Sequence, residues 1–234
     1  MATKKIQPPQ PPITTTKPAP AAAPSTDAGL DMMDWLQLNW RWMGGAAAVV
    51  AVAAAGYWFY IRSQQIKTTN AERSLMQAEQ SLQSGNLALA TSDLQRVVNR
   101  YKGTGAGTEA AMLLAQADYN AGKYQDGVKI LQEVAGKAGG SEAAVQSLIG
   151  DGQSQMGKSA DAAKSYEKAG QAAEFDGERA YYRAKAARSY LAAGNAAEAK
   201  RIWTALSTDE KSQAVAAEAR VRLAELEARR AGKS

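Results

Sequence analysis

Beyond about residue 66, small and apolar residues return every three or four positions, with polar residues between them. That period is typical of helices that bury one face. Glycine and short polar stretches interrupt the pattern and mark the turns between helices. We therefore predict helices at about 67–84, 87–101, 109–121, 124–136, 141–156, 159–174, 178–193, 196–206 and 212–230.

Four of the predicted turns contain a glycine at a similar place, namely Gly85, Gly122, Gly157 and Gly194. Their spacings are 37, 35 and 37 residues. A period of this size indicates stacked helical hairpins. Glycine suits such a turn because it adopts the positive φ that ends many helices.

The four copies share further features at fixed distances from these glycines. Seven residues before and five residues after each glycine stands a small residue: Ala78, Ala115, Gly150 and Ala187, then Ala90, Gly127, Ala162 and Ala199. Nine residues after comes a large one: Leu94, Leu131, Tyr166 and Trp203. Two helices of a hairpin approach closely where both residues are small, and a bulky residue one turn later fills the wider space.

This arrangement of small, glycine, small and large residues resembles the tetratricopeptide repeat over roughly residues 70–229. The resemblance implies an all-α solenoid that binds other proteins. Two features depart from the family, because the period exceeds the usual 34 residues and no proline closes a repeat. The last helix, at 212–230, is expected to cap the solenoid and shield the final repeat from water.

A different pattern occupies residues 30–66. The run from Trp42 to Ile61 contains no charged residue and, as a helix, would span about 30 Å, the thickness of a bilayer core. Aromatic residues typical of a membrane interface stand at both ends: Trp40, Trp42, Tyr57, Trp58 and Tyr60. We predict a single transmembrane helix at about 42–61, preceded by a short interfacial segment.

Two alternatives remain for this segment. The alanine-rich centre is only mildly apolar, so it could be a buried helix. Ala53–Ala55 could form a signal-peptide cleavage site, although the leader would then exceed forty residues. Gly44, Ala48, Ala51 and Ala55 form a small-residue surface on which a second transmembrane helix could pack.

All seven prolines lie within residues 1–29. A segment of Pro, Thr and Ala cannot bury enough apolar surface to fold, so a disordered tail is expected. The chain thus divides into a tail at 1–29, a membrane segment at 30–66 and a repeat domain at 67–234.

Composition narrows the function. The chain has no cysteine and no histidine, which removes thiolate and imidazole catalysis and the common zinc sites. The glycine-rich stretch 103–107 lacks the Lys-Ser/Thr of a phosphate loop and is predicted to be a linker. The net charge of +5 is spread among mixed acids and bases, which does not indicate nucleic-acid binding. We predict a non-enzymatic protein without cofactor or metal.

In a repeat solenoid of this kind the first helix of each hairpin lines the inner face. The residues 13, 6 and 3 positions before each glycine, with Met112, are therefore candidates for contact with short peptides or helices. The candidate partner groove consists of Glu72, Glu79, Leu82, Met112, Gln116, Tyr119, Asp151, Tyr181 and Arg188. Some of these residues could instead contact the neighbouring repeat.

Aromatic residues before and after an Ala/Gly/Val span, followed by an alanine-rich repeat domain, resemble the ancillary subunit of the SecYEG translocon. This resemblance implies a single-pass protein of the bacterial inner membrane, with a cytoplasmic N-terminus and a periplasmic repeat domain. It also implies translocon subunits, chaperones or emerging polypeptides as partners. The flanking charges alone do not fix the orientation, because long domains translocate largely regardless of charge. The alternatives are a self-associating scaffold of another membrane complex and an assembly factor for envelope proteins.

Overall fold

The structure, a computed structural model, describes residues 28–231. These residues form α-helices joined by short turns, and no strand occurs among them. The helices are α1 (Ala28–Gln83), α2 (Leu87–Arg100), α3 (Gly105–Asn120), α4 (Tyr124–Val134), α5 (Glu142–Gln155), α6 (Ser159–Ala172), α7 (Asp176–Ala192), α8 (Ala196–Ser207) and α9 (Gln213–Ala231). A single 3-10 turn, η1 (Gly139–Ser141), precedes α5. The prediction of an all-α fold is confirmed.

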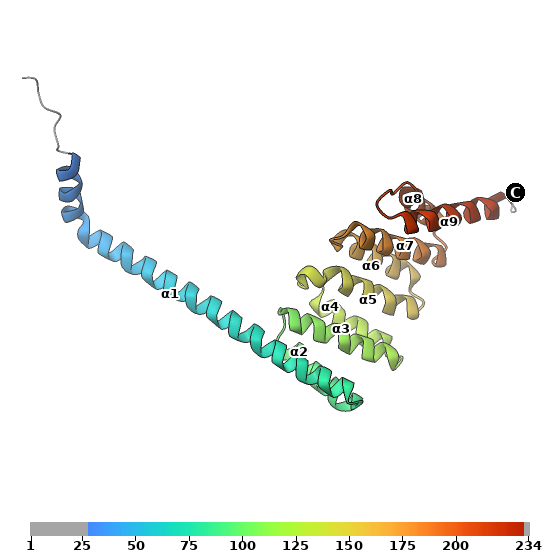
Figure 1. Cartoon of the computed structure of the whole chain (residues 1–234), viewed down its shortest axis with the longest axis horizontal. Helices are drawn as coiled ribbons and strands as arrows, with labels where there is room; N and C mark the ends of the chain where they lie inside the picture. Colours follow the sequence, from blue (N-terminus) through green and yellow to red (C-terminus); the bar gives the residue numbers. More distant parts are fainter. Residues whose placement is uncertain (1–27, 232–234) are drawn as a thin grey trace, which may run out of the picture. The chain divides into compact units, whose positions relative to one another are not determined.

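The chain separates into two units whose boundary falls inside α1, between Trp58 and Phe59. In the second unit, the last turns of α1 pair with α2, and the hairpins α3–α4, α5–α6 and α7–α8 follow in chain order (Figure 1). Helix α9 packs on α8 and α7 at the end of the stack. It has the place that the sequence predicts for a capping helix.

The four turn glycines have the predicted backbone conformation. Gly85, Gly122, Gly157 and Gly194 have φ values of 77°, 75°, 73° and 79°. A residue with a side chain rarely adopts these angles, so glycine is the residue that lets each first helix end and the chain reverse.

The small and large residues of the repeat are buried as predicted. Ala78, Ala115 and Ala187 of the first helices are fully buried, as are Ala90, Ala162 and Ala199 of the second helices. Large residues one turn later fill the core: Leu94, Leu131, Tyr166 and Trp203. Close approach of the two helices therefore depends on the small residues, as expected from their spacing.

The buried apolar residues form two clusters. One runs from Ala71 to Ile149 and joins α1–α5. The other runs from Ala162 to Ala219 and joins α6–α9. Between the two clusters, Gly150 of α5 lies against the Tyr166 ring of α6, and polar side chains join the two helices, so the buried apolar residues form two cores instead of one continuous core.

Three local predictions were wrong. Residues Gly105–Gly107 are not linker: they form the first turn of α3, because Thr104 accepts a hydrogen bond from the Gly107 amide. Ser159, followed by Asp161, resembles a helix cap in the sequence, but it is the first residue of α6, and no side-chain hydrogen bond caps that end. The helix predicted to begin near residue 67 is instead the continuation of α1, which has no break between residues 61 and 67.

Most of the predicted tail at 1–29 lies outside the described residues. Its last two residues, Ala28 and Gly29, are described and belong to α1. The predicted segment 30–66 lies within α1.

Candidate functional site

The first helices of the hairpins end in the same way, which places their side chains in a common register. The amides that follow α3, α5 and α7 bond back to the last turn: Lys123 to Asp118 O at 2.7 Å, Lys158 to Gln153 O at 2.9 Å and Asn195 to Tyr190 O at 2.8 Å. Such bonds satisfy carbonyls that a helix end leaves free. Equal numbering from each glycine therefore identifies equivalent positions on the three helices.

Asp151, a candidate groove residue on α5, is the centre of a polar cluster. Its Oδ1 accepts a hydrogen bond from the Tyr166 hydroxyl at 2.6 Å and binds the Lys185 ammonium at 2.6 Å. The same ammonium lies 4.5 Å from the centre of the Tyr166 ring and 5.7 Å from that of Tyr181. Lys185 thus brings Asp151 and Tyr181 of the candidate groove together.

The environment of Tyr166 keeps its hydroxyl protonated. Burial raises the pKa of Tyr166, and the hydrogen bond to the Asp151 carboxylate raises it further. A protonated hydroxyl remains a donor to Asp151, so the cluster holds α5, α6 and α7 together across the physiological pH range.

Tyr119 of the candidate groove makes a contact between repeats. Its hydroxyl donates to the carbonyl of Leu148 at 3.0 Å. A Cβ added to Gly152 would lie 2.5 Å from Cγ2 of Val128 and closer still to the Tyr119 hydroxyl. Burial, the largest cause, raises the pKa of Tyr119. The ring therefore supports the stacking of α5 on α3, and only part of it is exposed.

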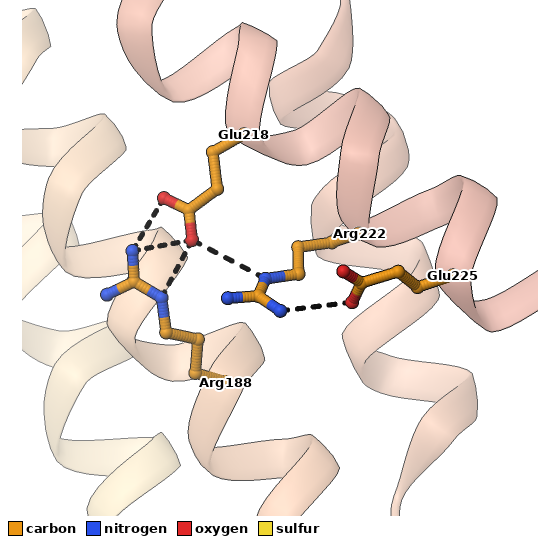
Figure 2. Close-up of polar contacts among 4 residues, drawn as sticks. All are labelled: Arg188, Glu218, Arg222 and Glu225. Carbon is orange, nitrogen blue, oxygen red and sulfur yellow. Dashed lines mark hydrogen bonds and ion pairs between the residues drawn. The ribbon is translucent and has the colours of Figure 1, made fainter.

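Arg188, the last residue of the candidate groove, pairs with the capping helix. Figure 2 shows its guanidinium beside the Glu218 carboxylate, with Nε 2.9 Å from Oε1 and Nη2 2.6 Å from Oε2. Glu218 also lies 3.7 Å from Nε of Arg222, and Arg222 bonds Glu225 at 3.0 Å. This chain of alternating charges fastens α9 to α7.

The remaining candidates lie on α1 and α3, and their side chains make fewer polar contacts within the protein. Glu72 and Gln116 are exposed, and Glu79, Leu82 and Met112 are half-buried. Within residues 28–231 neither the Glu72 carboxylate nor the Glu79 carboxylate forms a hydrogen bond or an ion pair. These two carboxylates therefore have no partner among the described residues, in contrast to Asp151 and Glu218.

The predicted interface aromatics all project from α1 into open space. Trp40, Trp42, Tyr57, Trp58 and Tyr60 are each at least 60% exposed. In the part of the chain that the structure describes, one helical stretch, Trp40–Gln83, contains a window apolar enough to cross a membrane, and none of that window is buried.

Lys185 and Glu218 complete these contacts and were not among the predicted residues. Lys185 stands nine positions before Gly194, a position that holds Leu113 and Leu148 in the two preceding hairpins. A lysine at a position that holds leucine in the two preceding hairpins is the sequence feature that could have identified Lys185 as the partner of an acidic residue.

Comparison with protein families matches residues 33–148 to a tetratricopeptide repeat-like domain. Among solved structures, a putative kinesin light chain with nearly identical TPR-like repeats, from Podosopora anserina, has a TM-score of 0.50 and 19% identity. The match covers 68% of this chain and 91% of that one, and a variant of the same protein gives the same values. A search of curated proteins gave no match. The structural similarity shows a TPR-like solenoid fold.

Proposed function

We propose that this chain, which carries a tetratricopeptide repeat-like domain, is a protein–protein interaction scaffold anchored to a membrane by the apolar part of α1. Helix stacks of this kind offer extended surfaces for binding other proteins. The finer proposal is an ancillary translocon subunit, with its repeat domain in the periplasm and its N-terminus in the cytoplasm. Its partners would be translocon subunits, chaperones or emerging polypeptides.

The observation that carries the anchoring proposal is the exposure of α1. From Val49 to Ile61 every residue is exposed, and the segment includes Val49, Val50, Val52 and Phe59. So large an exposed apolar surface is unfavourable in water and favourable in lipid. The family match begins at residue 33 and so includes this segment together with the first hairpins.

The fold supports a scaffold more than an enzyme. The tetratricopeptide repeat-like match and the similar solved structures have a fold that is typical of non-enzymatic scaffolds. Tyr119 and Tyr166 have raised pKa values, but both hydroxyls bond within the protein. Tyr119 donates to the Leu148 carbonyl and Tyr166 donates to Asp151, so both side chains hold helices of the stack together.

Anchoring is tested by extraction of membranes with alkaline carbonate. We expect the full-length chain to stay in the pellet and a Val50→Arg/Ala54→Arg variant to move to the supernatant, since each central arginine costs about 2.5–3.5 kcal/mol of insertion free energy. The matched control is Gln64→Arg/Gln65→Arg, which adds the same charge beyond the apolar run. Release of the unaltered chain by carbonate would contradict the proposal.

Orientation and partners need separate measurements. A reporter that is active on only one side of the membrane, fused after Ser234, is expected to report the periplasmic side. Crosslinking within the membrane followed by mass spectrometry is expected to recover translocon subunits or periplasmic chaperones. Recovery of neither would reject the translocon role and leave the general scaffold role standing.

A further inference from the structure

In the later repeats, one row of each first helix is covered by the preceding hairpin. The row consists of the positions 12, 9 and 5 before the turn glycine, and we call it the stacking row. All its members in α3, α5 and α7 are buried or half-buried: Ala110, Leu113 and Ala117; Val145, Leu148 and Gly152; Tyr182, Lys185 and Ser189.

Contacts between repeats show what covers the row. The Leu148 carbonyl accepts from Tyr119 of the preceding hairpin. Gly152 has no room for a Cβ because Tyr119 and Val128 of that hairpin lie against it. Lys185 binds Asp151 of the hairpin before its own. The stacking row is thus the surface by which each hairpin joins the one before it.

The first hairpin has the same row, and no residue between 28 and 231 covers it. Its members on α1, Arg73, Met76 and Gln80, are exposed, and 59% of Met76 is accessible. Continued towards the N-terminus in steps of three and four residues, the row adds Arg62, Ile66 and Thr69, all exposed. No described residue in the range 28–231 forms a hydrogen bond or ion pair with the side chain of Arg62 or Arg73.

The other end of the solenoid is treated differently. Helix α9 closes it, and its charged residues pair with one another and with α7 (Figure 2). Repeat arrays require such closure because an open stacking face exposes apolar surface to water. Exposed Ile66 and Met76 on the row of α1 are the surface that a missing neighbour would bury.

We propose that the stacking row of α1 is a docking surface for a helix of a partner protein. The facing side of that helix carries apolar residues for Ile66 and Met76 and acidic residues for Arg62 and Arg73. These arginines stand eleven residues apart, about 16 Å along a helix, and the acids must match that spacing.

Charge decides between such a partner and a second copy of this chain. Two copies inserted in one membrane lie parallel, so Arg62 would face Arg62 and Arg73 would face Arg73, and like charges at an interface oppose association. This step rests on the proposed anchoring. The row itself contains no acidic residue that could compensate.

Adjacent threonines provide a matched test. Thr69 belongs to the row, whereas Thr68 is equally exposed and points about 100° away around the helix. A photoreactive benzoylphenylalanine placed at either position in the full-length chain, in its native membrane, should crosslink at least about fivefold more at Thr69. Mass spectrometry then locates the crosslinked segment.

Support requires three results: the preference for Thr69, a crosslinked helix with acidic residues about eleven positions apart, and loss of the product in Arg62→Glu/Arg73→Glu. Lysines replacing those acids should restore the product. The control Arg220→Glu should leave it unchanged. Equal crosslinking at Thr68 and Thr69, a product composed of two copies of this chain, or a product that survives charge reversal would each overturn the proposal. Carbonate extraction of every variant separates loss of docking from loss of anchoring.

Discussion

The hydroxyl of Tyr166 on α6 and the ammonium of Lys185 on α7 share one carboxylate oxygen, Oδ1 of Asp151 on α5. A single side chain therefore connects three consecutive helices. It does so where the hydrophobic core is interrupted, between the cluster that ends at Ile149 and the cluster that begins at Ala162.

We expect Asp151→Ala to lower the free energy of unfolding by about 1–2 kcal/mol, since it leaves a mostly buried ammonium and a buried hydroxyl without their acceptor. Urea unfolding followed by far-UV circular dichroism measures the change. Asp161→Ala is the matched control, because its ion pair with Lys164 is 4.0 Å long and exposed, and it should cost less than about 0.5 kcal/mol. Equal effects of the two substitutions would contradict the assigned role of Asp151.

Gly152→Ala is expected to destabilise the repeat domain by about 1–3 kcal/mol, because the added methyl group overlaps Tyr119 and Val128. The contrasting substitution is Gly177→Ala, in the first turn of α7, where a Cβ meets nothing within 4 Å. That change should be neutral or stabilise by up to about 1 kcal/mol. Thermal unfolding measures both variants. The packing argument requires a clearly lower unfolding midpoint for Gly152→Ala than for Gly177→Ala.

Trp203 is fully buried, and its indole N–H has no hydrogen-bond partner within residues 28–231. A buried donor without a partner costs about 1–3 kcal/mol. Trp203→Phe removes that cost together with some packing, so we expect a net loss of no more than about 1 kcal/mol. Trp203→Ala, which empties the site, should cost about 3–5 kcal/mol. A phenylalanine variant as unstable as the alanine variant would show that the N–H is satisfied in solution.

Lowering the pH should remove the contribution of the Asp176 carboxylate to the stability of the folded state. A hydrogen bond from Lys211 is the main cause that holds the pKa of Asp176 below its ordinary value of 3.8, and the Arg179 charge adds to it. A lowered pKa means that the ionised form stabilises the fold above the unfolded-state pKa, and that this stabilisation is lost as the pH falls through the folded-state pKa.

The difference in unfolding midpoint between the unaltered chain and Asp176→Asn should therefore be present at pH 6–7 and close below about pH 4. Lys211→Met should reduce that difference at neutral pH. A difference that persists unchanged at pH 3 would contradict the assignment.

The sequence predicted the repeat architecture because each hairpin obeys local rules. Glycine was required at the four turns, and small residues were required where helices meet, so Gly157 and Ala162 could be assigned before any contact was known. Asn195, followed by Glu198, also resembles a helix cap in the sequence, and its side chain accepts a hydrogen bond from the Glu198 amide at 3.2 Å. Helix ends were harder: the glycines at 105–107 suggested a loop, yet Gly107 is needed because a Cβ there would overlap the Tyr101 carbonyl.

The candidate groove could be predicted only as a register of positions. Which of its residues are free depends on contacts between repeats that are far apart in sequence. Asp151 and Arg188 are matched by Lys185 and Glu218, 34 and 30 residues away. The groove remains a prediction, and Glu72 and Glu79 are its charged members whose side chains have no partner within residues 28–231.

The division of the solenoid into two cores has a bearing on how the protein is degraded. In repeat proteins, units that share few apolar contacts can open independently. A cut in the turn before α9 would loosen the contacts of Ala219 and Leu223 with the second cluster, whereas helices α1–α5 keep the cluster from Ala71 to Ile149. Proteolysis there would therefore expose apolar surface in the C-terminal repeats first and leave the N-terminal repeats intact longest.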